Sequence, residues 1–215
     1  MLFRSGQLVG DHYSCQANLM ETDAVWGAMS ESYLATAGPL ADRLMAALDA
    51  GEAAGGDQRG RQSAALLVVA AEGEPWQREI DLRVDDDPEP LVELRRLLRL
   101  GKSYALVREG DDLSLKGEGK GGADAYIAAW ELTPESHELK FWAALAFVER
   151  GEGDRGVALL REAIDVHDGW RHMLEHLTTE MVPSSAEARR LFAAEEEWGG
   201  ADPARGQGPG GVGPT

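Results

Sequence analysis

The sequence predicts an α/β domain followed by an all-helical repeat. Two observations predict the first part: an apolar run at residues 63–71, and apolar residues that alternate with charged ones at residues 79–84. A third predicts the second part, because glycines and apolar residues recur at a fixed spacing beyond Gly101. We expect domains at residues 8–100 and 110–198. A tail at residues 199–215, rich in Gly and Pro, should be disordered.

The first domain begins with a strand and two helices. Residues 12–19 alternate polar and apolar side chains as a strand does, and the chain then enters a loop. Asp23 is expected to cap a helix that runs to about Thr36. A second helix should start at Pro39, which suits the first helical turn, and should be ended by Gly51 and later by Gly55-Gly56.

A hairpin and a third helix complete this domain. After Ser63, the run to Ala71 is apolar throughout and β-branched in its middle, so we expect a strand covered on both faces. The alternation at residues 79–84 indicates a half-buried strand, and the two strands should pair. Asp87 and Pro88 then precede a strongly amphipathic helix that is rich in leucine.

The second domain repeats with a period of thirty-four residues. That spacing is typical of tetratricopeptide repeats, in which small residues allow two helices to approach closely. Ser184 with Glu187 also has the spacing of a capping box for a last helix. The pairs that share the period are Gly117 with Gly151, Gly122 with Gly156, Tyr126 with Leu160, and Ala129 with Ala163.

Charge and composition exclude several function classes. The formal net charge is -17, from 38 acidic and 21 basic residues, whereas nucleic-acid binding needs clustered Lys and Arg. The same charge disfavours anionic membrane surfaces, and no apolar run approaches the roughly 18 residues that span a bilayer. Neither nucleic acid nor membrane is therefore an expected partner.

The start of the chain lacks the apolar core of a signal peptide, so the default expectation is a cytoplasmic protein. Residues 2–5 also match the amino acids that the end of a common DNA-sequencing adapter encodes when it is translated in frame. We therefore expect that the natural N-terminus precedes this sequence, which leaves export open.

The loop at residues 53–65 carries the densest group of hydrogen-bonding side chains. Paired glycines allow positive φ angles there, and Asp57, Arg59, Gln62 and Ser63 crowd the mouth of the following strand. In layered α/β proteins such an edge is where sites form. The alternative is a tight turn in which Asp57 and Arg59 pair with each other. The glycine spacing matches neither phosphate-loop motif.

Other candidate sites are weaker, and we expect neither a metal nor a cofactor. Cys15 is the single cysteine, and it fits a half-buried strand position better than a nucleophile. The acidic run 85–87 is more typical of a helix cap than of a cation site. His172 and His176 lie four residues apart, but zinc would need a third ligand.

Part of the chain resembles a known family. The residues that carry the resemblance are Tyr13–Met20, then Gly55-Gly56-Asp57 with Arg59-Gly60 and Gln62–Ala65, then Asp81–Asp86. They look like the family catalogued as domain of unknown function 1028, over about residues 8–100, the rear half of that domain. The family resembles N-terminal-nucleophile hydrolases, which fold as an αββα sandwich. Some members carry a rear helical segment described as peptidoglycan-binding, and residues 110–195 look similar to it.

The resemblance implies an amide-bond hydrolase scaffold. A Thr, Ser or Cys at the chain start would attack the amide, with its own α-amino group as the base. This sequence starts with Met1-Leu2 and lacks the front strands, so no residue takes the role of nucleophile and this fragment should be inactive. The supporting residues, which would orient substrate or stabilise an oxyanion, are Asn18, Asp57, Arg59, Gln62 and Ser63.

The helical repeat is expected to dock an unknown peptide, protein or cell-wall polymer, and association with a second copy of the chain stays open. An alternative function is a non-catalytic binding or scaffold protein. In that case the α/β part would be a degenerate enzyme, and the repeats would present a groove to a peptide.

Overall fold

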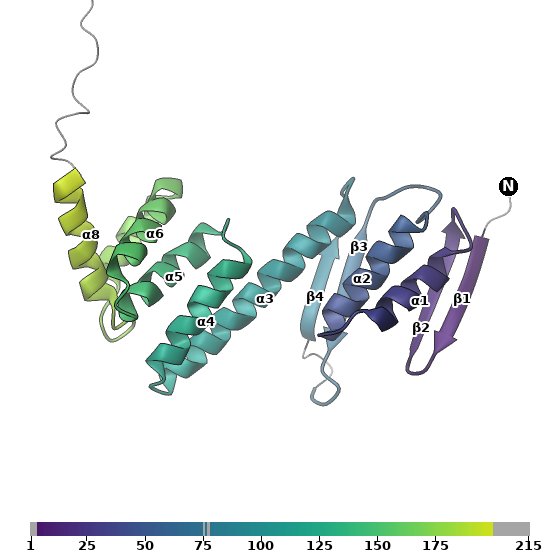
Figure 1. Cartoon of the computed structure of the whole chain (residues 1–215), viewed down its shortest axis with the longest axis horizontal. Helices are drawn as coiled ribbons and strands as arrows, with labels where there is room; N and C mark the ends of the chain where they lie inside the picture. The colour runs from purple at the N-terminus through teal and green to yellow at the C-terminus, as the bar shows by residue number, and fades with distance from the viewer. Residues whose placement is uncertain (1–3, 75, 77, 200–215) are drawn as a thin grey trace, which may run out of the picture. The chain divides into compact units, whose positions relative to one another are not determined.

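The computed structural model describes residues 4–74, 76 and 78–199. The chain divides into two compact units, one up to Gly101 and the other from Lys102 onward. Strands occur in the first unit, and the described part of the second is helical (Figure 1). An α/β part followed by a helical part is what the sequence predicted. The tail at residues 200–215, predicted to be disordered, lies outside the described residues.

The first unit contains two separate antiparallel hairpins. In one of them β1 (Arg4–Gly10) pairs with β2 (Tyr13–Met20), and Leu8 is opposite Cys15. Residues 12–19 were predicted as a strand, but β1 was missed because Arg4–Gly10 carries three glycine or serine residues and only weak alternation. His12 turns the chain with a positive φ of 62°.

The second hairpin pairs β3 (Ala64–Val69) with β4 (Arg78–Val84), as predicted. The expectation that β3 is covered on both faces is wrong. Leu66 and Val68 are buried, whereas Leu67 and Val69 are 56% and 53% exposed. The apolar run reflects β-propensity on both faces, but helices of the described chain cover only one of them.

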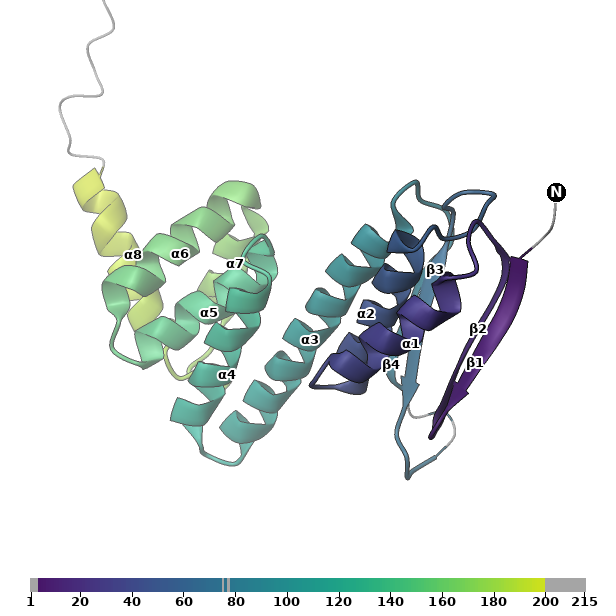
Figure 2. The same cartoon turned by 45° about the vertical axis from the view of Figure 1, so that its right-hand side comes forward.

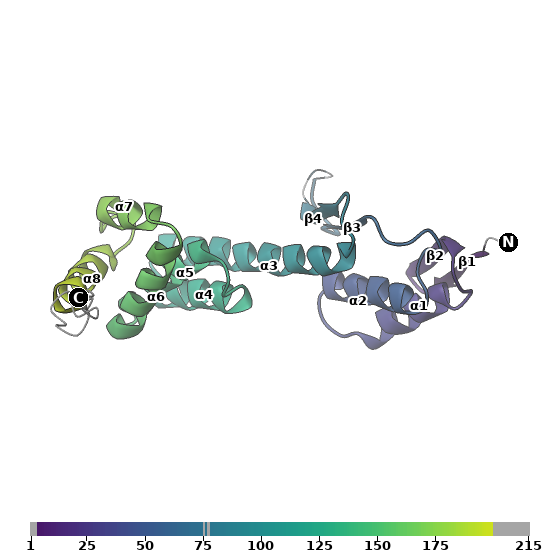
Figure 3. The ribbon, with the colours of Figure 1, turned by 90° about the horizontal axis from the view of Figure 1, so that it is seen from above.

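Two helices follow the first hairpin. α1 (Val25–Ala35) starts after Ala24, so the prediction that Asp23 caps it is wrong; the Thr22 hydroxyl instead accepts a hydrogen bond from the Ala24 N–H at 3.3 Å. α2 (Leu40–Ala53) begins one residue later than expected, because Pro39 has an extended ψ of 149° and is the N-cap, and Gly51 lies inside the helix. α2 packs so closely on α1 that position 51 has no room for a side chain, since a Cβ there would lie 2.9 Å from Cγ of Met29. Figure 3 shows both helices on the same side of the strands.

The core of the first unit forms between helices and the second hairpin. Leu94 and Leu98 of α3 (Pro90–Leu115) and Met45 of α2 pack with the buried face of β3 and β4. The helix predicted after Pro88 therefore exists, but it does not end at Gly101 and continues into the second unit. Gly101 is exposed and an added Cβ would meet open space, so nothing stops the helix there.

The second unit repeats its helix pairs. α3 ends at Leu115 and is followed by α4 (Gly119–Leu132); α5 (His137–Glu149) is followed by α6 (Gly153–Val166) (Figure 2). Thirty-four residues separate the ends of α3 and α5, and also both ends of α4 and α6. The glycines between the paired helices, Gly117 and Gly151, have φ angles of 80° and 82°.

Small residues bring these helices close together. A Cβ on Gly156 of α6 would lie 2.7 Å from the Ala144 carbonyl oxygen of α5, and a Cβ on Gly122 of α4 would lie 3.0 Å from the Gly110 carbonyl oxygen of α3. Residues 110 and 144 are again thirty-four apart. Ser103 and Thr133, both buried, share a hydrogen bond of 2.7 Å between their hydroxyls.

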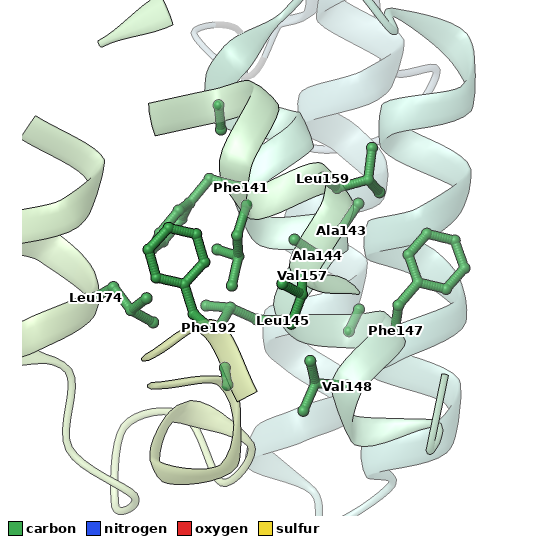
Figure 4. Packing of buried hydrophobic residues seen from close by; sticks show 14 of the residues in the cluster. Phe141, Ala143, Ala144, Leu145, Phe147, Val148, Val157, Leu159, Leu174 and Phe192 are labelled. Carbon is green, nitrogen blue, oxygen red and sulfur yellow. The ribbon is translucent and has the colours of Figure 1, made fainter. Parts of the chain in front are cut away.

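Aromatic and aliphatic side chains fill the core of the second unit. Phe141, Leu145 and Phe147 of α5 are almost fully buried, and Leu174 and Phe192 approach the cluster from the last helices (Figure 4). These last helices are α7 (Gly169–His176) and α8 (Ser185–Gly199).

The predicted capping box at the start of α8 is wrong. The Ser184 hydroxyl is buried without a hydrogen-bond partner among the described residues, and Glu187 instead pairs with Arg190. No helix in the described part of the chain is both long and apolar enough to cross a membrane.

Candidate functional site

A cavity of about 1020 Å³ lies within the first unit. One wall is β2 at Gln16–Asn18, and the other is the loop that leads into β3. Side chains of α1 and α2 line it, together with the start of α3. Segments far apart in the sequence therefore surround one space.

The loop after α2 is fixed against the end of β2. The Glu21 N–H donates to the Gly56 carbonyl at 3.0 Å, and the Gln58 N–H donates to the Leu19 carbonyl at 2.9 Å. Gly56 has a φ of 59°, a conformation that favours glycine. These two hydrogen bonds place Asp57 and the residues after it at the mouth of the cavity.

Asp57 and Arg59 form a bidentate pair at this mouth. Nε and one terminal nitrogen of Arg59 donate to the two carboxylate oxygens at 2.9 and 2.6 Å. The Arg59 backbone N–H also donates to the carboxylate, at 2.8 Å. The hydrogen bond from the Arg59 side chain is the main cause that lowers the pKa of Asp57, against a smaller opposing effect of burial. Asp57 is therefore a carboxylate near neutral pH.

Two further arginines connect the loop and α3 to α2. Arg61 donates to Glu52 of α2 and to Glu89, which precedes α3. Arg95 of α3 pairs with Asp49 of α2. All of these groups line the cavity, so its wall alternates positive and negative charge.

All five residues that the sequence singled out line this one cavity. Asn18 comes from β2, Asp57 and Arg59 from the glycine loop, and Gln62 and Ser63 from the segment before β3. The Gln62 carbonyl accepts a hydrogen bond of 2.9 Å from the Asp87 N–H, which holds that segment to the end of the second hairpin. The alternative interpretation, that Asp57 and Arg59 pair within a turn, describes the same contacts.

Sequence reasoning missed the charged residues that α2, α3 and the residue before α3 contribute, which are Asp49, Glu52, Arg95 and Glu89. Nothing in their local sequence distinguishes them from other exposed charges on helices. Arg61 stood inside the distinctive loop, where an arginine among glycines was a signal that could have been used.

Of the weaker candidates, Asp86 lines the cavity, whereas Cys15, Asp85 and Asp87 do not. Cys15 is 6% exposed and does not line the cavity, and burial raises the pKa of its thiol. Asp85 pairs with Arg83, and Asp87 accepts the Glu89 N–H. In the described part of the chain, no group of three His, Cys, Asp or Glu side chains could hold a metal ion.

Comparison with known proteins finds that the first unit is similar to a known family. Residues 2–94 match the model of a family of unknown function, DUF1028. This match confirms the resemblance that the residues of β2, the glycine loop and β4 indicated. No curated protein matches the chain.

One similar solved structure is the crystal structure of protein SPO2555 from Silicibacter pomeroyi, which is also assigned to DUF1028. It is 32% identical to this chain over 44% of this chain and 39% of its own length, with a TM-score of 0.38. The present chain therefore spans less than half the length of that protein.

Proposed function

We propose that the cavity of the DUF1028-like unit binds an amide-bearing substrate, and that an amide bond is cleaved there by the chemistry of an N-terminal-nucleophile hydrolase. The nucleophile would lie outside the described residues, so residues 4–74, 76 and 78–199 alone should be inactive. Unit 1 would then be the rear part of an αββα sandwich.

The observation that carries this proposal is that distant segments of the chain bring polar side chains to one cavity. Asn18 and the pair Gln62 and Ser63 are more than forty positions apart in the sequence, yet they line one cavity together with Asp57 and Arg59. Carboxamide, hydroxyl and guanidinium groups are the donors and acceptors that complement a peptide-like amide. Sites of this kind gather a few polar groups around a concave surface.

The roles follow from the contacts of each group. Asp57 is held as a carboxylate by Arg59, and its lowered pKa makes it a poor proton acceptor near neutral pH. It therefore serves to position Arg59, whose guanidinium keeps N–H groups for a substrate oxygen. Asn18 and Gln62 would orient the amide or stabilise the oxyanion that forms when its carbonyl is attacked.

The helical unit would serve as an interaction module of tetratricopeptide type. The thirty-four-residue repetition of helix ends and close glycine contacts supports this assignment. Its partner would be a peptide, a protein or a cell-wall polymer.

The second candidate function is a binding or scaffold protein without catalysis. The bidentate Asp57–Arg59 pair favours it, because both carboxylate oxygens of Asp57 already accept hydrogen bonds from Arg59 inside the turn. In that case the cavity would be left from an enzyme, and binding by the helical unit would be the activity.

The test begins with the complete reading frame that contains this sequence. We expect its mature product to begin with Thr, Ser or Cys carrying a free amine, as mass spectrometry can determine, and to hydrolyse some members of an amide library. Substitution of that terminal residue should abolish activity. A blocked or unreactive terminal residue would instead support the scaffold function.

A matched pair of glutamines tests the cavity itself. Gln62→Ala should lower kcat by about 10²-fold if Gln62 stabilises an oxyanion. Gln58→Ala is the control, because Gln58 lies in the same loop but does not line the cavity. Equal decreases in kcat for the two substitutions would show that they act by disturbing the conformation of the loop and not by removing an oxyanion contact.

A further inference from the structure

We infer that the cavity receives an extended polypeptide strand, which adds to the free edge of β2 at Gln16–Asn18. The inference rests on the proposed function only in that the strand would be the substrate at the same site. It names the class of substrate: a peptide in β conformation, recognised mainly through its backbone.

The first support is an unpaired strand edge inside the cavity. Among residues 4–74, 76 and 78–199, β2 pairs with β1 along one edge, and each hairpin is a separate two-stranded sheet. Gln16, Ala17 and Asn18 line the cavity. A strand edge carries a row of N–H and C=O groups ready to pair with another chain.

The second support is that β2 is already paired with the glycine loop at one end of the cavity. Met20 forms an antiparallel bridge with Asp57, flanked by the hydrogen bonds of residues 19 and 21 to residues 58 and 56. The loop then leaves β2, and opposite Gln16–Asn18 the cavity takes its place. A bound strand would pair with Gln16–Asn18 beside this bridge, separated from it by Leu19, which has a φ of 59°.

The third support is a group of apolar residues on the helix side of the cavity, which lie beside the charged residues Asp49 and Glu52. Val25 and Met29 of α1 and Leu48 and Gly51 of α2 contribute to it. A strand that pairs with β2 turns every second side chain toward these helices. Those side chains should be apolar and the alternate ones polar.

The charge of the cavity determines which polar side chains the bound strand should carry. Five carboxylates line the cavity, those of Asp49, Glu52, Asp57, Asp86 and Glu89, against the three guanidinium groups of Arg59, Arg61 and Arg95. The excess of negative charge favours Lys or Arg at the alternate positions of the bound strand.

The size of the cavity also suits a peptide. Its volume of about 1020 Å³ is at the top of the range of about 300–1,000 Å³ for small-molecule pockets.

The experiment uses the whole chain and a blocked synthetic peptide of about six residues that alternates Val and Lys. Amide hydrogen exchange, followed by NMR, should slow by about tenfold or more at one or more of residues 16–18 when the peptide saturates. The same peptide with alternate amides N-methylated is the control and should give no protection, because it cannot complete the ladder.

A variant pair tests the apolar side. Met29→Gln should weaken peptide binding about tenfold, whereas Leu34→Gln, which changes an exposed residue of the same helix outside the cavity, should not change it. Protection elsewhere, or binding of the N-methylated peptide as tightly as its parent, would overturn the inference. Protection that rises with protein concentration in the absence of peptide would also overturn it, since a second copy would then be the occupant. Because binding is measured without turnover, a failed amidase screen would refute only the hydrolysis.

Discussion

At the scale of single residues, hydrogen bonds between chemically different groups fix much of the local structure. The Tyr104 hydroxyl donates to a carboxylate oxygen of Glu138 at 2.6 Å and so joins α3 to α5. This hydrogen bond, followed by burial and the negative charge of Glu138, raises the pKa of Tyr104 to about 12. The contact is therefore visible in the alkaline titration of the protein.

The first prediction concerns this tyrosine. A raised folded-state pKa means that its stabilising effect is complete below the ordinary tyrosine pKa of about 10 and is lost as pH rises toward 12. Tyr104→Phe should lower the free energy of unfolding by about 1 kcal/mol at neutral pH, after allowance for solvent. Urea unfolding at several pH values should show the difference from the parent shrinking above about pH 10.

Glu138→Gln is the control for the cause of the shift. It keeps a hydrogen-bond acceptor but removes the charge, so the phenol should titrate closer to its ordinary pKa, as ultraviolet absorbance of the phenolate can measure. An unchanged titration in this variant would mean that burial, and not the carboxylate, raises the pKa of Tyr104.

At the scale of elements, the helix pairs depend on glycines that leave room for a neighbouring backbone. Gly156 faces the Ala144 carbonyl, and an added Cβ would lie 2.6 Å from Cγ2 of Val148. Gly122 occupies the equivalent place one repeat earlier. The repeat therefore has a physical cause, since each pair needs a small residue where its helices cross.

The second prediction follows from this packing. Gly156→Ala should destabilise the protein by about 1–3 kcal/mol, because the methyl group must push α5 and α6 apart. Gly122→Ala should have a similar effect. Gly101→Ala is the control: it lies in open space within α3 and should stabilise by up to about 1 kcal/mol. Urea unfolding measures all three, and a neutral Gly156→Ala would contradict the close contact.

At the scale of the whole molecule, the two units differ in how completely they cover their apolar surface. Phe141, Leu145 and Phe147 are almost fully buried in the helical unit. In the α/β unit, Leu67 and Val69 are exposed on the open face of β3, and each hairpin has only two strands. Two-stranded sheets are marginal unless something packs on them.

The third prediction is that limited proteolysis cuts residues 8–100 before residues 110–195. Unpaired strand edges and exposed apolar faces should open more often than the helical core, and cleavage follows such local opening. Mass spectrometry of the early fragments gives the order of cleavage. Longer survival of residues 8–100 would show that the hairpins are stabilised by contacts stronger than those described above.

The sequence by itself predicted the order of an α/β part and a helical part, the hairpin of β3 and β4, and the thirty-four-residue period. These features depend on local periodicity and turn residues, which a chain carries whatever its neighbours do. The loop from Gly55 to Ala65 was also identified in advance, because its glycines and polar groups are contiguous.

Only the tertiary structure decided which surfaces those elements share. It joined Asn18 to Gln62 and Ser63 around one cavity, and it added Glu52 and Arg95 from helices that looked unremarkable in the sequence. It also left one face of β3 open although both faces are apolar. The reason is that burial and ion pairing depend on contacts between distant segments, and a local pattern specifies the shape of an element but not its neighbours.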